Sequence, residues 1–371
     1  PLKLKHGCVF SQFSTIVDHM KAARLVGLLA AASGGGGAAG AAAGPLPTFD
    51  GASATALAGE ALRVTGAVLL EGAASSVEDF QRIALQTWRA GGYDLGLGGY
   101  HGGTVYRPEL AAGVYDVGAG AQADLPVPAH QEKAYMVEVP RFVGFACFRP
   151  AEEGGELLIS DQAKIAQGLP AAMLERLKSQ GVTYLRRYGD ADLTPNFTYP
   201  TGSWQKRFET NSFAEAQQVA RSDRQLGAGG ASLELQADLT VRLRWHSPAV
   251  AIAEGGEERL VQSILDYHNS SGVAVEGAMG TSAIHAMWGD GAEFSPGEVA
   301  ALQKAARSSV AASVKLQAGD VILLDNFRFG HGREAYHGAR KHAALMSEEV
   351  PRTVRVAHCE EDTCHARAGR A

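Results

Sequence analysis

Three residues in this sequence have the types and the spacing of a metal site. His130 and Glu132 are two positions apart, and in an extended strand such residues point to the same face, so both side chains can reach one point. His331 lies far along the chain, after a buried apolar run and an Asp-Asn turn. Two histidines and one carboxylate form the set that holds non-haem Fe(II) and leaves positions open for substrate and O2. A lone histidine in a strand is more often structural, so this prediction depends on the surroundings.

The elements that must position these residues are mainly strands with helices around them. Alternating or β-branched apolar runs predict strands at 61–70, 137–148, 233–245, 314–317 and 320–324. Capping residues and helical periodicity predict helices at 75–89, 170–179, 213–221 and 295–310. Residues 91–120 are rich in Gly and Tyr and predict a loop. No repeat or change in composition divides residues 55–350, so we expect one mainly β domain with peripheral helices.

Composition excludes several classes of protein. The chain has 371 residues, with 34 Lys+Arg against 40 Asp+Glu, a formal net charge of −6. A protein that binds nucleic acid or an anionic membrane surface needs a basic surface, so neither partner is expected. Four cysteines are too few for a disulfide scaffold.

The two ends differ from the middle of the chain. Residues 1–54 form an N-terminal extension with a Gly/Ala-rich stretch, which is interpreted either as a linker or as the remnant of a targeting peptide. The apolar run 25–32 is too short to span a bilayer, so the expected location is cytoplasmic or organellar and not transmembrane. Residues 351–371 are expected to be a tail, in which Cys359 and Cys364 do not have a strong zinc spacing.

Taken together and in order, the motifs resemble those of a known family. They are Gly66–Leu70, Pro128–Glu132, Glu138–Pro140 leading into Phe145–Cys147, Glu153–Glu156, Ser203–Gln205 to Phe208–Thr210, Gly289–Gly291, and Gly319–Asp320 through His331–Arg333 to Arg340. The sequence resembles the taurine dioxygenase/TfdA-like branch of the Fe(II)/2-oxoglutarate-dependent dioxygenases, which includes clavaminate-synthase-like and syringomycin-biosynthesis-like members. The resemblance covers roughly residues 60–348.

The resemblance implies a double-stranded β-helix, or jelly-roll, core with Fe(II) at its mouth. His130, Glu132 and His331 would be the metal ligands, with 2-oxoglutarate and O2 as cosubstrates. Arg340 would bind the far carboxylate of 2-oxoglutarate, a role that suits the planar and always charged guanidinium group. Arg333 is the competitor for that role, although a salt bridge that shapes the His331 loop is the favoured interpretation for it.

The implied reaction oxidises a small, amino-acid-like molecule. One oxygen of O2 would enter 2-oxoglutarate, which leaves as succinate and CO2, and the other would oxidise a C–H bond of the substrate. Halogenating relatives lack the carboxylate that Glu132 provides here, so hydroxylation, desaturation or ring closure is expected instead. Tyr135 is the expected aromatic contact to the substrate, and Arg187 is a candidate for holding an acidic group.

Two positions depart from the family pattern. Many relatives have a threonine that hydrogen-bonds 2-oxoglutarate where this chain has Leu157. Relatives that bind sulfonates have a second cation where this chain has Ala344, so a sulfonate is not the expected substrate. A double-stranded β-helix binding protein without turnover is the alternative function, and a zinc hydrolase on the same triad is a third. The presence of Arg340 beside three metal ligands argues against both.

Overall fold

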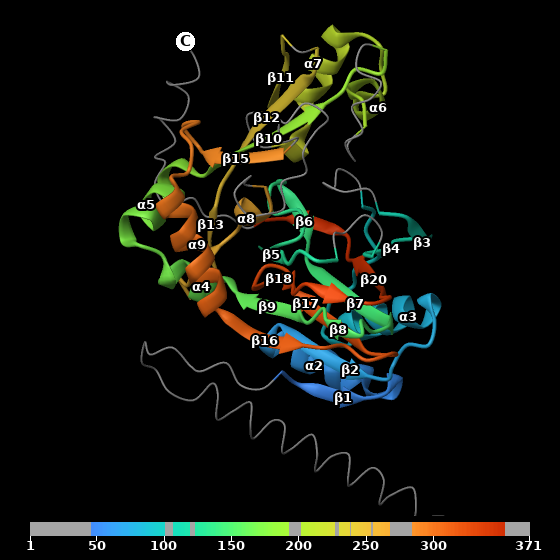
Figure 1. Ribbon diagram of the computed structural model, residues 1–371. Coiled ribbons are helices and arrows are strands. Elements are labelled where there is room, and N and C mark those ends of the chain that lie inside the picture. Colours follow the sequence, from blue (N-terminus) through green and yellow to red (C-terminus); the bar gives the residue numbers. More distant parts are fainter. Residues whose placement is uncertain are drawn as a thin grey trace, which may run out of the picture. The chain divides into compact units, whose positions relative to one another are not determined.

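Two β-sheets carry the residues of interest in the computed structural model (Figure 1). The structure describes residues 46–100, 107–118, 123–192, 202–226, 230–237, 239–253, 255–267 and 284–352. The larger sheet has the strand order β1 (Thr48–Asp50), β2 (Ala67–Glu71), β17 (Val321–Asp325), β7 (Phe142–Arg149), β20 (Lys341–Met346), β4 (Val114–Asp116) and β3 (Glu109–Ala111). The smaller sheet has the order β16 (Val310–Val314), β9 (Leu157–Asp161), β18 (Phe329–Arg333) and β5 (Val127–His130). Neighbouring strands are antiparallel, except for the parallel pair β1 and β2.

Strand β7 shows why the two sheets face each other. Because side chains of a strand alternate between faces, Ala146 packs against helices α2 (Thr55–Thr65) and α3 (Val77–Ala90) on the outer face of the larger sheet. Phe145 and Cys147 point the other way, into an apolar cluster that includes residues of the smaller sheet. Both faces of β7 are therefore buried, which accounts for its continuous apolar sequence.

A second sheet system lies above the two facing sheets in the view of Figure 1. Its strand order is β11 (Ala231–Leu235), β12 (Val241–Ser247), β10 (Val182–Tyr188) and β15 (Ile284–Trp288). Its apolar cluster includes side chains of the helices α4 (Gln162–Gly168), α5 (Ala171–Gln180), α7 (Phe213–Ser222) and α9 (Pro296–Ser308). Tyr135, three residues after Glu132, belongs to the same cluster. The segment that follows β5 is thereby anchored in this second system.

The remaining elements are short. The helices are α6 (Trp204–Phe208) and α8 (Ile264–Tyr267), with single 3-10 turns at Ala52–Ala54 and Arg224–Leu226. The strands are β6 (Glu138–Pro140), β8 (Glu153–Gly154), β13 (Val250–Ile252), β14 (Glu258–Leu260), β19 (Tyr336–His337) and β21 (Glu349–Pro351).

The predicted fold class is confirmed: the protein is mainly β with peripheral helices, and the two facing sheets form a double-stranded β-helix. The helices predicted from capping residues are also confirmed. Ser76 caps α3 by accepting a hydrogen bond from Asp79 N, and Ser295 forms a capping box with Glu298 at the start of α9.

Three predicted strands are wrong in part. Residues 61–65 belong to α2, because Ala58, Ala61 and Leu62 recur at helical spacing and pack on α3. The alternating run 233–245 is two antiparallel strands, β11 and β12, separated by a turn in which Leu239 has a φ of 63°. The strand predicted at 314–317 lies instead at β16.

The chain divides into two compact units, of which the second begins at Leu46 and contains every described element. β1 therefore belongs to this unit, although it lies in the predicted N-terminal extension. Residues 1–45 and the pair Cys359 and Cys364 are outside the described residues. Within the described ranges, none of the helices has the length and apolar character needed to cross a membrane.

Candidate active site

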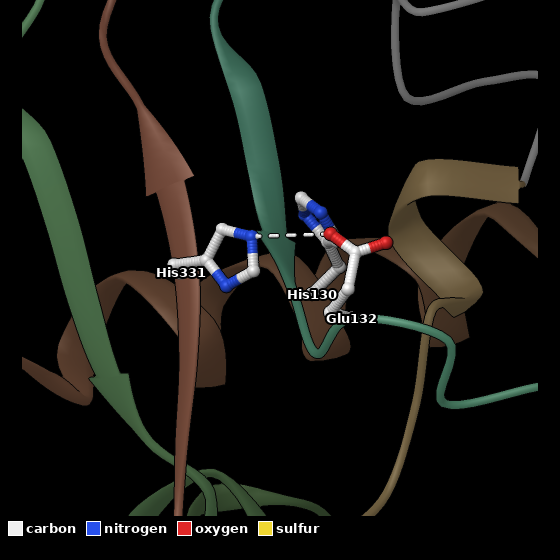
Figure 2. A group of neighbouring side chains, drawn as sticks. All are labelled: His130, Glu132 and His331. Carbon is white, nitrogen blue, oxygen red and sulfur yellow. Dashed lines mark ion pairs between the residues drawn. The ribbon is translucent and has the colours of Figure 1, made fainter. Parts of the chain in front are cut away.

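The structure brings His130, Glu132 and His331 together in one buried place (Figure 2). His130 ends β5 directly opposite His331 of β18, and this pairing places the two ring centroids 4.4 Å apart. The ligand atoms of all three residues lie within 4.8 Å of one another, and Glu132 Oε2 is 4.0 Å from His331 Nε2. Ligands at about 2.0–2.2 Å from one metal ion are separated by about 3–4 Å, so the three donors fit a shared divalent cation.

Glu132 reaches the histidines from a turn and not from the extended strand that its spacing predicts. β5 ends at His130, and the chain then folds back with Lys133 at a φ of 55°. This left-handed conformation costs a non-glycine residue about 1–2 kcal/mol. The Lys133 ammonium group is fully buried, where it forms an ion pair with Glu349 and donates a hydrogen bond to Gly99 O at 3.0 Å. These contacts hold the turn, so Glu132 points to the same side as His130.

Asn326 fixes the backbone of Glu132. Its Oδ1 accepts a hydrogen bond from Glu132 N at 2.9 Å, and its Nδ2 donates to Glu132 O and to Pro140 O, both at 3.0 Å. The Asn326 side chain is buried. From the sequence alone, Asn326 is predicted only as part of a turn. Its place between a buried apolar strand and His331 is the one sequence feature that indicates a role at the site. Asn326 therefore positions the backbone of Glu132, one of the three clustered donors.

Gln131, between the two ligands of the turn, ties it to a second segment. Its Nε2 donates to Asn326 O at 2.6 Å, and its Oε1 accepts from Gln262 N at 3.2 Å. Ser263 Oγ donates to Gln131 O at 3.1 Å. All of these groups are buried, so each bond satisfies a polar atom that would otherwise be costly to remove from water. The ligand turn is thus held from two sides.

The protonation of the two histidines suits metal binding. His130 Nδ1 lies 2.9 Å from Pro128 O, and because a carbonyl oxygen only accepts, this nitrogen donates and carries the proton. In the neutral ring, Nε2 of His130 then carries no proton, and its lone pair can bind a metal. Burial, and then the nearby His130 and Arg107, hold the pKa of His331 well below its usual range. A neutral imidazole is the form that binds a metal ion.

Arg340 lies immediately before β20, beside a buried histidine. Its Nη2 is 2.9 Å from Nδ1 of His342, and its guanidinium carbon is 5.4 Å from the centre of the Tyr336 ring. Burial and the nearby Arg333 lower the pKa of Arg340 to about 10. Within the described part of the chain, Nε of Arg340 and Nε2 of His342 are buried and have no hydrogen-bond partner. Two close guanidinium groups and buried unpaired N–H groups fit the far carboxylate of 2-oxoglutarate.

Arg333 differs from Arg340 in that it makes hydrogen bonds to backbone carbonyl groups. It donates to Leu125 O and Glu334 O, both at 2.9 Å, and its guanidinium carbon is 4.7 Å from the Tyr336 ring centre. These contacts hold the 123–125 segment that leads into β5. These hydrogen bonds are consistent with the favoured structural role, in which Arg333 shapes the loop around His331.

Leu157 and Ala344, the two departures from the family pattern, lie in the apolar cluster between the sheets. Phe145 of the same cluster has its ring centre 4.9 Å from that of His331. Leu157 is directly opposite Arg333 in the pairing of β9 with β18. Neither position offers a polar side chain to this interior, so any donor for 2-oxoglutarate besides Arg340 must come from elsewhere.

Tyr135 lies in a buried aromatic group with Tyr184, Trp245 and Tyr267. The guanidinium carbon of Arg186 is 4.8 Å from the Tyr135 ring centre, and Arg186 Nε donates to Tyr267 Oη at 3.0 Å. The predicted residue Arg187, by contrast, is only half-buried. Strand alternation places Arg186 among the aromatics, and the sequence did not indicate which face of β10 is inside.

Arg107 is a cation near the metal ligands that sequence reasoning missed. Burial acts to lower the pKa of Arg107, but the nearby Tyr100 and Glu132 act to raise it, and the net effect is a raised pKa. Its guanidinium carbon is 4.8 Å from the Tyr100 ring centre. It lies in the Gly- and Tyr-rich stretch that reads as a loop, and a lone arginine in such a stretch carries no signal of its own. Arg107 adds positive charge on the side of Tyr135.

Comparisons with known proteins find relatives of this chain. The chain is similar to the dapdiamide synthesis protein DdaC of Enterobacter agglomerans, with 24% identity over 260 residues, which are 68% of this chain and 74% of the relative. An asparagine oxygenase, solved with Fe(II), 2S,3S-3-hydroxyasparagine and succinate, has a TM-score of 0.46 and 12% identity, covering 80% of this chain and 79% of its own. The PvcB protein of Pseudomonas aeruginosa has a TM-score of 0.41 and 16% identity, covering 79% and 80%.

The family model of the taurine catabolism dioxygenases TauD and TfdA matches residues 32–346, which is most of the chain. The matched range contains the three clustered donors and Arg340. The chain therefore belongs to the taurine catabolism dioxygenase TauD, TfdA family and is an Fe(II)- and 2-oxoglutarate-dependent dioxygenase.

Proposed function

We propose that His130, Glu132 and His331 hold the Fe(II) of this dioxygenase and that Arg340 binds the far carboxylate of 2-oxoglutarate. The observation that carries the proposal is the buried convergence of the three donors from two paired strands and one turn. When bound, Fe(II) and 2-oxoglutarate supply the activation of O2, with release of succinate and CO2 and oxidation of a C–H bond of the substrate. The chain's own residues position these groups and keep water out.

Each side chain has a separate task in this proposal. The hydrogen bond from His130 Nδ1 to Pro128 O keeps the ring in the orientation and protonation state that presents Nε2. Asn326 fixes the turn that carries Glu132. Phe145, whose ring lies beside that of His331, adds apolar surface that excludes water. Such exclusion strengthens the electrostatic interactions made inside the site.

The carboxylate of Glu132 favours hydroxylation, desaturation or ring closure over halogenation. A halide would need the metal position that the carboxylate takes, and Glu132 is held beside His331 with Oε2 4.0 Å from its Nε2. The backbone N–H and C=O of Glu132 are both hydrogen-bonded to Asn326. The turn is therefore held in place, and the Glu132 side chain cannot move away from the metal position. A substrate C–H bond is therefore oxidised and not halogenated.

The substrate in this proposal is a small, amino-acid-like molecule. Tyr135 lies on the same turn as Glu132 and offers an aromatic face, and the positive charge of Arg107 and Arg186 on that side suits a carboxylate. Arg187 stays a candidate for the same task. The similarity to a dapdiamide synthesis protein supports a small-molecule substrate.

Release of succinate tests the proposal directly. Succinate is measured with a panel of amino acids and their derivatives, and we expect formation only when Fe(II), O2 and 2-oxoglutarate are all present. His130→Ala and His331→Ala remove a metal ligand each and should abolish it, whereas His337→Ala, at an exposed position, should not. Full activity of either ligand variant would refute the assignment. Binding of Fe(II) and 2-oxoglutarate without turnover of any compound would instead favour a binding protein.

A further inference from the structure

His342 lies in the same interior as the candidate metal site. It is opposite Cys147 in the pairing of β20 with β7, and paired residues point to the same face of a sheet. On that face the next pair is Ala344 and Phe145, and the Phe145 ring lies beside His331. The His342 side chain is 4% exposed. It therefore faces the space between the two sheets and not the helices on the outer face.

The contact with Arg340 determines which ring nitrogen of His342 carries the proton. A guanidinium group only donates hydrogen bonds, so Nδ1, at 2.9 Å from Arg340 Nη2, must accept. The proton of the neutral ring is then on Nε2. Among the described residues no acceptor meets this Nε2, although it is buried. A buried N–H group without a partner is costly, which indicates that a ligand completes it.

The charge around His342 keeps this arrangement at physiological pH. Burial, followed by the nearby guanidinium groups of Arg340 and Arg333, lowers the pKa of His342 to about 3. The ring is therefore neutral, with Nδ1 free to accept from Arg340. Nε2 remains a hydrogen-bond donor. Because the guanidinium groups of Arg340 and Arg333 are nearby, an anionic acceptor is its favoured partner.

Leu157 explains why such a donor is needed in this chain. The family resemblance places a threonine that hydrogen-bonds 2-oxoglutarate at this position, and the structure has an apolar, buried leucine in the interior cluster. Ala344, on the same face of β20 as His342, has no polar group either. His342, which accepts a hydrogen bond from Arg340, then offers a neutral donor beside it.

We propose that His342 is a 2-oxoglutarate-binding residue, donating from Nε2 to the far carboxylate that Arg340 binds, in place of the missing threonine. The inference rests on the proposed function of Arg340. A hydrogen bond from a neutral donor to a carboxylate contributes enough that its loss weakens binding by about 10- to 100-fold.

Two variants and two ligands test the inference. Binding is measured by calorimetry on the Fe(II)-loaded protein without O2, with 2-oxoglutarate and with 2-oxovalerate, whose chain ends in a methyl group. His342→Phe keeps the ring volume but removes the donor. It should bind 2-oxoglutarate about 10- to 100-fold more weakly and 2-oxovalerate as well as the original protein does. His342→Gln offers an oxygen to Arg340 and an N–H to the ligand, so it should recover most of the affinity. His337→Phe, at the exposed position of strand β19, is the matched control.

The outcomes separate this inference from the function on which it rests. Unchanged 2-oxoglutarate affinity in His342→Phe overturns the role of His342. An equal loss for both ligands also overturns it, because the effect would then come from distortion of the site. If the original protein binds Fe(II) but no 2-oxoglutarate, the proposed function of Arg340 fails as well.

Discussion

Among the residues that are not proposed metal ligands, Asn326 is the one whose side chain should matter most for the stability of the site and for its Fe(II) affinity. Asn326→Leu keeps the approximate volume and removes three buried hydrogen bonds, at 2.9, 3.0 and 3.0 Å. It leaves the N–H and C=O of Glu132 and the C=O of Pro140 buried and unpaired. Each such group costs about 1–3 kcal/mol, so the three together should cost the metal-free protein about 3–9 kcal/mol of unfolding free energy. Because the turn that carries Glu132 is released, Fe(II) affinity should also fall by about 10- to 100-fold.

Urea denaturation of the metal-free protein measures the first effect, and anaerobic calorimetry with Fe(II) measures the second. Asn326→Asp keeps the acceptor for Glu132 N but turns an oxygen toward two carbonyl groups, so it should be no better than the leucine variant. The same substitution at the exposed Asn211 is the control and should change neither quantity. Wild-type Fe(II) affinity together with a loss below about 1 kcal/mol would refute the reasoning.

Three further predictions concern Arg340, His342 and Lys133. Arg340→Ala removes the cation assigned to the far carboxylate, so the KM for 2-oxoglutarate should rise by about 100-fold in the succinate assay; an unchanged KM would contradict the assignment. The pKa of His342 is lowered to about 3, so in acid the unfolded chain binds a proton that the folded protein does not. Between the usual histidine pKa near 6.5 and about pH 3, this group alone should reduce the unfolding free energy by about 1.4 kcal/mol per pH unit as the pH falls. Denaturation at a series of pH values should show that the unfolding free energy of His342→Phe depends less on pH than that of the original protein. Identical slopes for the two proteins would contradict a lowered pKa of His342. Lys133→Ala leaves Glu349 without its cation and should lower the thermal midpoint, at a cost of about 3–5 kcal/mol, whereas the double change Lys133→Met with Glu349→Gln should recover more than half of the loss. A double variant as unstable as the single one would show that the ion pair is not the cause.

The sequence was sufficient for the features that depend on local pattern. Capping residues located α3 and α9, and the order of the motifs indicated the fold and the metal donors. The strand predicted at 61–70 was wrong over residues 61–65, because β-branched Val64 and Thr65 suggest a strand while the burial of Ala61 and Leu62 against α3 favours a helix. That contact is made by another part of the chain, which a local pattern does not contain.

The same limit applies inside the site. Arg186 and Arg187 are neighbours, and only the pairing of β10 with β12 and β15 decides which of them faces the aromatic residues. Asn326 acts on a turn that is remote from it in sequence. His342 lies on a strand whose inner face the sequence does not indicate. Their roles depend on tertiary contacts, so residue type and spacing could not reveal them.

The position of β5 at the edge of the smaller sheet has a consequence for how the protein responds to iron supply. β5 has only β18 beside it in this sheet and carries His130 into the Glu132 turn, whereas His331 lies on β18, between β5 and β9 (Figure 1). Edge strands open more readily than interior ones, and one local opening here would withdraw two donors at once. An ion held by both strands opposes that opening by mass action, by about 2.7 kcal/mol at a free concentration 100 times its dissociation constant. In iron-poor conditions the pair β5 and β18 would be the first part of the core to exchange its amide protons. Bound iron would slow this exchange by holding the two strands together.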